Sequence, residues 1–226
     1  MLESRPRLKK AADMVRFGAP VVDVGTDHAY LPVYLLLNGK IPYAIAGDIG
    51  TGPLDNALQT VKKYGVGNHI TLVVSDGLTN IDIPHKANVT VCGMGGTLMS
   101  EILEKSKEKL LSSEAHLVLQ PMTHSEDVRK WLDNNGFEIT SEQCVFDGGH
   151  TYCCIAADLT ADTKKHQVGY YYFGTIEKVN EAEISYINSQ LERIKKRLNG
   201  LSLSDGNSNE KVLLNDVISY YESRYR

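Results

Sequence analysis

The chain has 226 residues, of which 42% are hydrophobic and 23% charged, and its formal net charge is −4. This length suits one domain with an appendage or two small domains, and the acidic balance argues against general adhesion to nucleic acid. No apolar run reaches the ~18 residues of a membrane span, and the basic N-terminus lacks the apolar stretch of a secretory signal. We therefore expect a cytoplasmic protein without a membrane partner.

The four cysteines are Cys92, Cys144, Cys153 and Cys154, and none of them forms a CxxC pair. This spacing predicts neither a disulfide framework nor a metal site.

Strand-like and helical segments alternate along the first part of the chain. A basic helix is expected at about 4–17. The predicted strands are 20–25, 43–48, 70–75, 88–93 and 116–121, and the predicted helices are 28–38, 52–64, 96–111 and 124–135. Strands separated by helices indicate a parallel sheet with right-handed crossovers. Two further strand-like runs, 138–147 and 151–159, are joined by Gly148 and Gly149, which predicts a hairpin and a final antiparallel strand.

The pattern changes again beyond residue 160. Apolar residues spaced three and four apart form a heptad seam at Ile184, Ile187, Leu191, Ile194 and Leu198. After a polar loop at 199–209, a second amphipathic stretch carries Leu214, Val217, Ile218, Tyr221 and Tyr225. We expect residues 1–160 to form an α/β domain and residues 161–226 a C-terminal helical coiled-coil hairpin, through which the chain could form a homo-oligomer.

The most informative segment is 21–31, VVDVGTDHAYL, which reads as a buried strand, a tight turn at Gly25 and a helix start. Such a turn lies at the carboxyl end of a strand, where nucleotide-like ligands bind. It lacks the later glycines of a dinucleotide fingerprint, since Asp27 and Tyr30 occupy their places. A carboxylate repels a pyrophosphate but favours a cationic sulfonium or amino group. The turn therefore points to S-adenosylmethionine rather than to NAD.

Two more acidic residues end predicted strands. Asp48 follows the second strand, 23 residues after Gly25, where a carboxylate can accept hydrogen bonds from a ribose diol. It could instead cap the following helix. Asp76 ends the third strand, where it could accept from an adenine amino group or form an ordinary Asp-Gly turn.

The fourth predicted strand runs into Cys92-Gly-Met-Gly-Gly96, where three glycines indicate either close approach of a ligand or a flexible turn. The segment lacks both the Asn/Asp-Pro-Pro-aromatic motif of enzymes that methylate exocyclic amines and the Cys-Pro of pyrimidine methylation. These absences favour a ring nitrogen as target and favour Cys92 as a bystander thiol. No catalytic residue is identified. The candidates for a target-base pocket are His28, Tyr30, Met94 and Gly95, with His124 and 120–123 on its far side.

At these motifs the chain resembles the TrmK family of bacterial tRNA (adenine-22-N1)-methyltransferases. The matching segments are 23–32 (DVGTDHAYLP), 47–49 (GDI), 92–96 (CGMGG) and 119–122 (LQPM), together with the helical C-terminus. The resemblance implies a class I, Rossmann-like fold, S-adenosylmethionine as cofactor and tRNA as substrate. The cofactor-binding residues expected on this basis and from the turns are Asp23, Gly25, Thr26, Asp27, His28, Asp48, Ile49, Asp76, Gly77 and Gly93.

Other interpretations stay open at this point. A class I methyltransferase could act on another RNA, a protein or a small molecule, since a fold does not fix a substrate. A protein without catalytic activity could bind RNA or form a scaffold through its hairpin. Two basic clusters could meet phosphates or be solvated helix faces: Arg5, Arg7, Lys9, Lys10 and Arg16, and later Arg193, Lys195, Lys196 and Arg197.

Overall fold

The computed structural model describes residues 5–161, 166–203 and 208–226. Residue 4, where the predicted first helix starts, and residues 204–207 of the predicted polar loop lie outside the described residues.

A seven-stranded sheet forms the centre of the molecule, in the order β3-β2-β1-β4-β5-β7-β6. The strands are β1 (Val21–Val24), β2 (Ala44–Asp48), β3 (Ile70–Val74), β4 (Asn88–Met94), β5 (His116–Pro121), β6 (Phe137–Asp147) and β7 (His150–Leu159). The first five pair in parallel, whereas β7 is antiparallel to both β5 and β6. Gly148 and Gly149 join β6 to β7 with φ angles of 57° and 80°, as a tight hairpin turn requires. The predicted sheet with its final antiparallel hairpin is confirmed.

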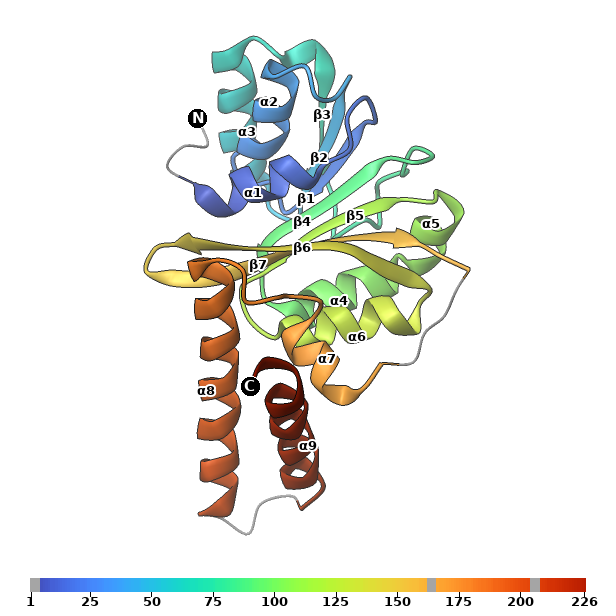
Figure 1. Ribbon diagram of the computed structural model, residues 1–226. Helices are drawn as coiled ribbons and strands as arrows, with labels where there is room; N and C mark the ends of the chain where they lie inside the picture. The colour runs from blue at the N-terminus through green and yellow to red at the C-terminus, as the bar shows by residue number, and fades with distance from the viewer. Residues whose placement is uncertain (1–4, 162–165, 204–207) are drawn as a thin grey trace.

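Helices cover both faces of this sheet (Figure 1). α1 (Pro6–Met14), α2 (Tyr30–Leu37) and α3 (Thr51–Tyr64) lie on one face, followed by a short 3-10 turn at Gly67–His69. α4 (Gly96–Lys105), α5 (Lys107–Ser112) and α6 (Ser125–Asn134) lie on the other. The single helix predicted at 96–111 is wrong, because the buried Ser106 interrupts it. Within the described residues, no helix combines the length and apolar character needed to cross a membrane.

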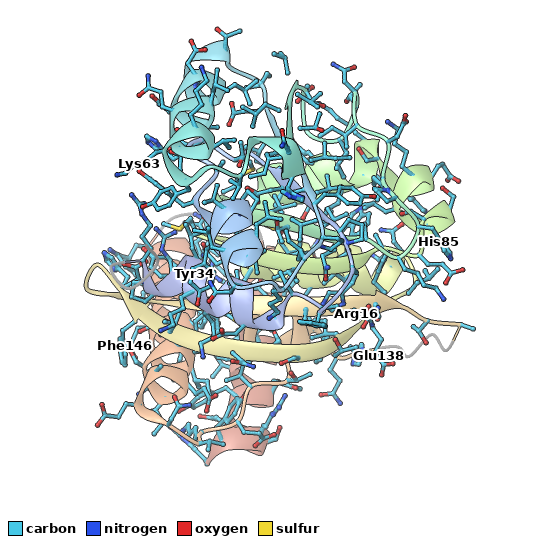
Figure 2. All side chains as sticks on the ribbon, turned by 90° about the horizontal axis from the view of Figure 1, so that it is seen from above. Arg16, Tyr34, Lys63, His85, Glu138 and Phe146 are labelled. Carbon is cyan, nitrogen blue, oxygen red and sulfur yellow. The ribbon has the colours of Figure 1, made fainter. Side chains whose placement is uncertain are left out.

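The N-terminal helix is tied to the sheet by polar contacts at its end. Arg16 Nη2 lies 2.7 Å from Asp158 Oδ2 on β7, and the Arg16 backbone N–H donates to Asn88 Oδ1 at 2.7 Å. Figure 2 shows Arg16 beside the long strands of the hairpin. These contacts hold α1 against the half of the sheet formed by β4, β5, β7 and β6.

Three helices follow the sheet: α7 (Val168–Phe173), α8 (Glu181–Ser202) and α9 (Ser208–Tyr225). Asn180 and Glu183 form a capping box that starts α8. α8 extends away from the hairpin with α9 beside it (Figure 1). In the predicted seam, Ile187, Leu191 and Ile194 are buried, whereas Ile184 is 40% exposed. α7 was not predicted, because six residues with three tyrosines show no helical periodicity.

The hydrophobic core does not stop at the end of the sheet. One continuous cluster joins Leu119 of β5 and Ile155 of β7 to Ile187 of α8 and Val217 of α9. α8 and α9 thus pack against the sheet and share its core. The division between residues 160 and 161 into two domains stays a prediction.

A buried ion pair connects the sheet to these helices. The Arg129 and Glu142 side chains are both fully buried, with Arg129 Nε 2.7 Å from Glu142 Oε1. The guanidinium also donates to the backbone carbonyl of Tyr171 at 2.9 Å and to the hydroxyl of Tyr186 at 3.2 Å. Burial alone would lower the pKa of Arg129, but the charge of Glu142 raises it well above its ordinary value. Arg129 thus stays charged and joins α6, β6, α7 and α8.

We predict that Arg129→Met destabilises the protein by about 3–5 kcal/mol, because it leaves the Glu142 carboxylate buried without its partner. Lys130→Met is the matched control, since Lys130 is the exposed neighbour on α6, and it should change stability by no more than about 0.5 kcal/mol. Urea unfolding of the two variants measures both values. Equal stabilities of the two variants would contradict a structural role for the buried pair.

Candidate active site

A cavity of about 310 Å³ opens at the carboxyl ends of β1, β2 and β4. Its lining comes from α1, from the turns after these three strands and from the start of α2: Arg5, Arg7, Leu8, Asp23, Gly25, Thr26, Asp27, His28, Tyr30, Leu31, Asp48, Cys92, Gly93 and Met94. Most of the residues that the sequence marked as cofactor or target-base residues therefore meet in one place.

The turn after β1 forms the floor of the cavity. Gly25 has a φ of 71°, and a side chain there would collide with the Met94 side chain, so only glycine fits. The backbone N–H groups of Gly25 and Thr26 both donate to the carbonyl of Gly47 on β2, at 2.8 and 3.0 Å. Asp27 follows with a φ of 45°, a conformation that is uncommon outside glycine. This geometry presents the Asp27 carboxylate to the cavity.

Asp23 is buried below this turn and is held by two hydroxyl groups. Thr26 Oγ1 donates to Asp23 Oδ2 at 2.7 Å, and Thr90 Oγ1 donates to Asp23 Oδ1 at 2.6 Å. Burial raises the pKa of Asp23 to about 6, although both hydrogen bonds act in the opposite direction. A buried carboxylate with a raised pKa gains most from a cationic ligand, which would restore its charged form.

Asp48 lines the same cavity from the end of β2, the strand next to β1. Its Oδ1 accepts from the backbone N–H of Gly50 at 2.9 Å, which orients the carboxylate at the start of α3. Asp23, Asp27 and Asp48 thus face one cavity from two neighbouring strands. Carboxylates in this arrangement can accept hydrogen bonds from a diol and attract a positive charge.

Planar groups stack at the rim of the cavity. The rings of His28 and Tyr30 are stacked with centroids 5.0 Å apart, and the Arg5 guanidinium lies 4.3 Å from the centroid of the Tyr30 ring. His28 Nε2 lies 3.6 Å from Asp27 Oδ2. A flat ligand such as a nucleobase could join this stack.

Four of the predicted cofactor and target-base residues do not line the cavity, and neither do His124 and 120–123, which were expected on its far side. Ile49 is 72% exposed after β2. Asp76 pairs with Lys105 at 3.3 Å, and a side chain at Gly77 would press on Ile102, so this Asp-Gly turn packs on α4. Gly95 caps the start of α4. Binding roles for these four residues stay predictions.

Arg7 has no specific role in the sequence-based predictions, but it lines the cavity in the structure. Its Nε pairs with Asp147 at 2.7 Å, and its Nη1 donates to Gln120 Oε1 at 3.2 Å. Gln120, fully buried, also accepts from the backbone N–H of Gly93 at 3.1 Å. Arg7 therefore holds the turn after β4 through Gln120. The only signal in the sequence was the early cluster of basic residues.

Cys92 also lines the cavity, but its thiol has low reactivity. Burial raises the pKa of the Cys92 thiol well above its ordinary value, and the nearby Asp23 carboxylate acts in the same direction. The thiol is therefore a poor nucleophile at neutral pH. Among the described residues, no group of three or more His, Cys, Asp and Glu side chains is placed to hold a metal ion.

Comparisons with known proteins agree with this geometry. Residues 4–155 match the family model described as a methyltransferase domain. A tRNA (adenine(22)-N(1))-methyltransferase of Bacillus subtilis is 38% identical over 157 residues, which cover 70% of this chain and 66% of that protein. The alignment thus spans just under two thirds of the relative's length.

Two solved structures extend the likeness to nearly the whole chain. TrmK of M. capricolum, in complex with S-adenosyl-homocysteine, has a TM-score of 0.79 and 28% identity and covers 96% of both chains. A Streptococcus pneumoniae protein in complex with S-adenosyl-L-methionine has a TM-score of 0.79 and 29% identity over 96% of this chain and 97% of that one.

The pKa of Asp23 leads to a pH-dependent prediction. Folded Asp23 keeps its proton up to about pH 6, whereas an unfolded aspartate releases it near 3.8. The folded state binds more protons in this interval, so the contribution of Asp23 to stability falls as the pH rises from about 4 to 6. The difference in unfolding free energy between Asp23→Asn and the parent should therefore shift in favour of the variant as the pH rises from 4 to 7. The expected shift is on the order of 2–3 kcal/mol.

Urea unfolding of the parent and of Asp23→Asn at pH 4 and at pH 7 measures this difference. Asp55→Asn, which removes an exposed carboxylate from α3, is the control for the loss of one negative charge. A difference between Asp23→Asn and the parent that is the same at both pH values would contradict the account.

Proposed function

The chain belongs to the methyltransferase domain family, and we propose that it transfers a methyl group from S-adenosylmethionine to N1 of adenine 22 in tRNA. The observation that carries this proposal is the cavity at the strand ends, where Asp23, Asp27 and Asp48 converge. Its supports are the B. subtilis relative, which is a tRNA (adenine(22)-N(1))-methyltransferase, and the two neighbours with bound S-adenosyl-L-methionine or S-adenosyl-homocysteine.

The residues present fit this cofactor. The backbone of Gly25 carries no side chain at the cavity floor, where the end of the Met94 side chain lies against it. Asp48 would accept hydrogen bonds from the ribose diol, while Asp23 and Asp27 would face the cationic amino and sulfonium groups. S-adenosylmethionine supplies a methyl group made electrophilic by its bond to a positively charged sulfur. Gly93 and Met94 line the remaining wall, where the absence of a side chain at Gly93 permits close approach.

The other residues of the cavity would orient the adenine. N1 lies on the Watson–Crick edge, so the base must leave its pair before it can react. The stacked rings of His28 and Tyr30 provide a platform for the extruded base. N1 of neutral adenine carries a lone pair and no proton, so it attacks the methyl carbon directly while the bonding pair of the carbon–sulfur bond returns to sulfur. No general base is required, and the rate then depends on proximity and alignment.

The C-terminal helices would contact the rest of the tRNA. Of the four basic side chains clustered on α8, three already have acidic partners: Arg193 with Glu126 at 2.8 Å, Lys195 with Glu192 at 3.1 Å and Arg197 with Glu210 at 2.7 Å. Such half-exposed pairs contribute little stability and can be exchanged for phosphate contacts. In this proposal residues 1–160 bind the cofactor and transfer the methyl group, and residues 161–226 contact the tRNA. The same helices could also join two copies, and the site of action would be the cytoplasm.

We predict that Asp48→Ala weakens S-adenosylmethionine binding at least tenfold, because each charge-assisted hydrogen bond to the ribose contributes about 1.5–3 kcal/mol. Asp55→Ala is the control, since it removes an exposed carboxylate from the helix that follows. Calorimetric titration measures both affinities. Unchanged affinity in a folded Asp48→Ala protein would place the cofactor elsewhere.

The position of methylation can be tested on tRNA directly. Incubation with S-adenosylmethionine and digestion to nucleosides should give 1-methyladenosine by mass spectrometry. A transcript with guanine in place of adenine 22 should give none. The appearance of N6-methyladenosine, under conditions that prevent rearrangement, or of a methylated pyrimidine would contradict the assignment.

A further inference from the structure

A second and larger cavity, of about 620 Å³, lies between the sheet domain and the C-terminal helices. Its walls come from the segment between β5 and α6, from the start of β7 and from α7, α8 and α9. The residues that matter for its chemistry are Met122, Thr123, Tyr152, Tyr172, Gln190 and Arg193. The size is suitable for a nucleotide, since small-molecule sites typically have volumes of about 300–1,000 Å³.

This second cavity adjoins the first through a shared wall. The backbone N–H of Met122 donates to the carbonyl of Met94 at 2.8 Å, so the two cavities follow the ends of adjacent strands β4 and β5. Arg7 lines the first cavity and contacts two residues of the second. Its Nη1 lies 2.8 Å from Met122 Sδ, and its guanidinium carbon is 5.0 Å from the centroid of the Tyr152 ring.

The lining suits a flat, polar ligand attached to a phosphate. Tyr152 and Tyr172 supply aromatic rings, and each has a guanidinium near its ring, Arg7 for Tyr152 and Arg193 for Tyr172. Bases stack on such rings whatever their identity. Thr123 and Gln190 add a hydroxyl and an amide that can hydrogen-bond to base edges.

The charges at the cavity also allow an anionic ligand. Glu126 and Glu210 line it, but each carboxylate is held by a guanidinium: Arg193 donates to both oxygens of Glu126 at 2.9 and 2.8 Å, and Arg197 Nε donates to Glu210 at 2.7 Å. Burial alone would raise the pKa of Glu126, but Arg193 lowers it overall. Arg193 and Arg197 therefore line the cavity together with their acidic partners, and His124 lines it as well.

We propose that this cavity binds the nucleotide adjacent to the target adenine, with its base against Tyr152 or Tyr172 and its phosphate near Arg7 and Arg193. This inference rests on the proposed tRNA methylation. Neighbouring nucleotides of one strand would then occupy the two neighbouring cavities, separated by Arg7 and Met122. Holding the adjacent nucleotide out of the helical stack keeps the target base extruded and fixes its position before methyl transfer.

Filling the cavity tests the proposal without removing a core residue. Gln190→Trp places a large ring in the cavity from α8. Asn188→Trp places the same ring two residues earlier, on the exposed side of that helix. We expect Gln190→Trp to raise the KM for tRNA about 10-fold or more, equivalent to about 1.4 kcal/mol, and to leave the calorimetric affinity for S-adenosylmethionine unchanged. Asn188→Trp should leave both values at those of the parent.

Ultraviolet crosslinking of the parent protein to unmodified tRNA gives a second readout. Mass spectrometry should find nucleotides attached to the peptides that contain Tyr152 or Tyr172. An unchanged KM for Gln190→Trp, together with crosslinks confined to other segments, would overturn the proposal. If the parent protein itself does not methylate tRNA, the proposed function fails instead, so the two failures are distinguishable.

Discussion

Parallel pairing of β1 with its two neighbours is the constraint on which the site depends. The register aligns Val24 of β1 with Gly47 of β2 and with Val91 of β4. Because parallel strands all end at the same edge, the turns that follow them meet there, although they are far apart in the sequence. Three acidic residues and the glycine turn after β4 come together for this reason. The cavity at the strand ends is a consequence of strand order.

Long-range polar contacts then tie the N-terminal and C-terminal helices to the sheet. Arg7 reaches from the N-terminal helix to Asp147 in the hairpin, and Arg129 reaches from α6 to Tyr186 on α8. The first contact holds Arg7 in the wall of the cavity at the strand ends, and the second ties α8 to the sheet. The larger cavity forms where these helices meet the strand ends. The two arginines thus connect the fold of the sheet to the walls of the two cavities.

The features predictable from the sequence were local ones. The pattern within 21–31 predicted a strand, a tight turn and a helix, and the Gly148-Gly149 pair predicted the hairpin, because period and turn chemistry act over a few residues. The role of Arg7 was not predictable, since its partner Asp147 is 140 positions away. For Asp76 the ordinary Asp-Gly turn was an open alternative, and its carboxylate pairs with Lys105 outside the cavity. The heptad pattern predicted the helix of α8 correctly but not its burial against the sheet.

The central claim is that the acidic cavity at the ends of β1, β2 and β4 binds S-adenosylmethionine in one defined orientation. A crystal structure of the protein with this cofactor tests the claim most directly. The account predicts that the ribose hydroxyls lie within hydrogen-bonding distance of Asp48 and that the methyl group faces Gly93 and Met94. Cofactor bound in the larger cavity, or with its ribose remote from Asp48, would contradict it.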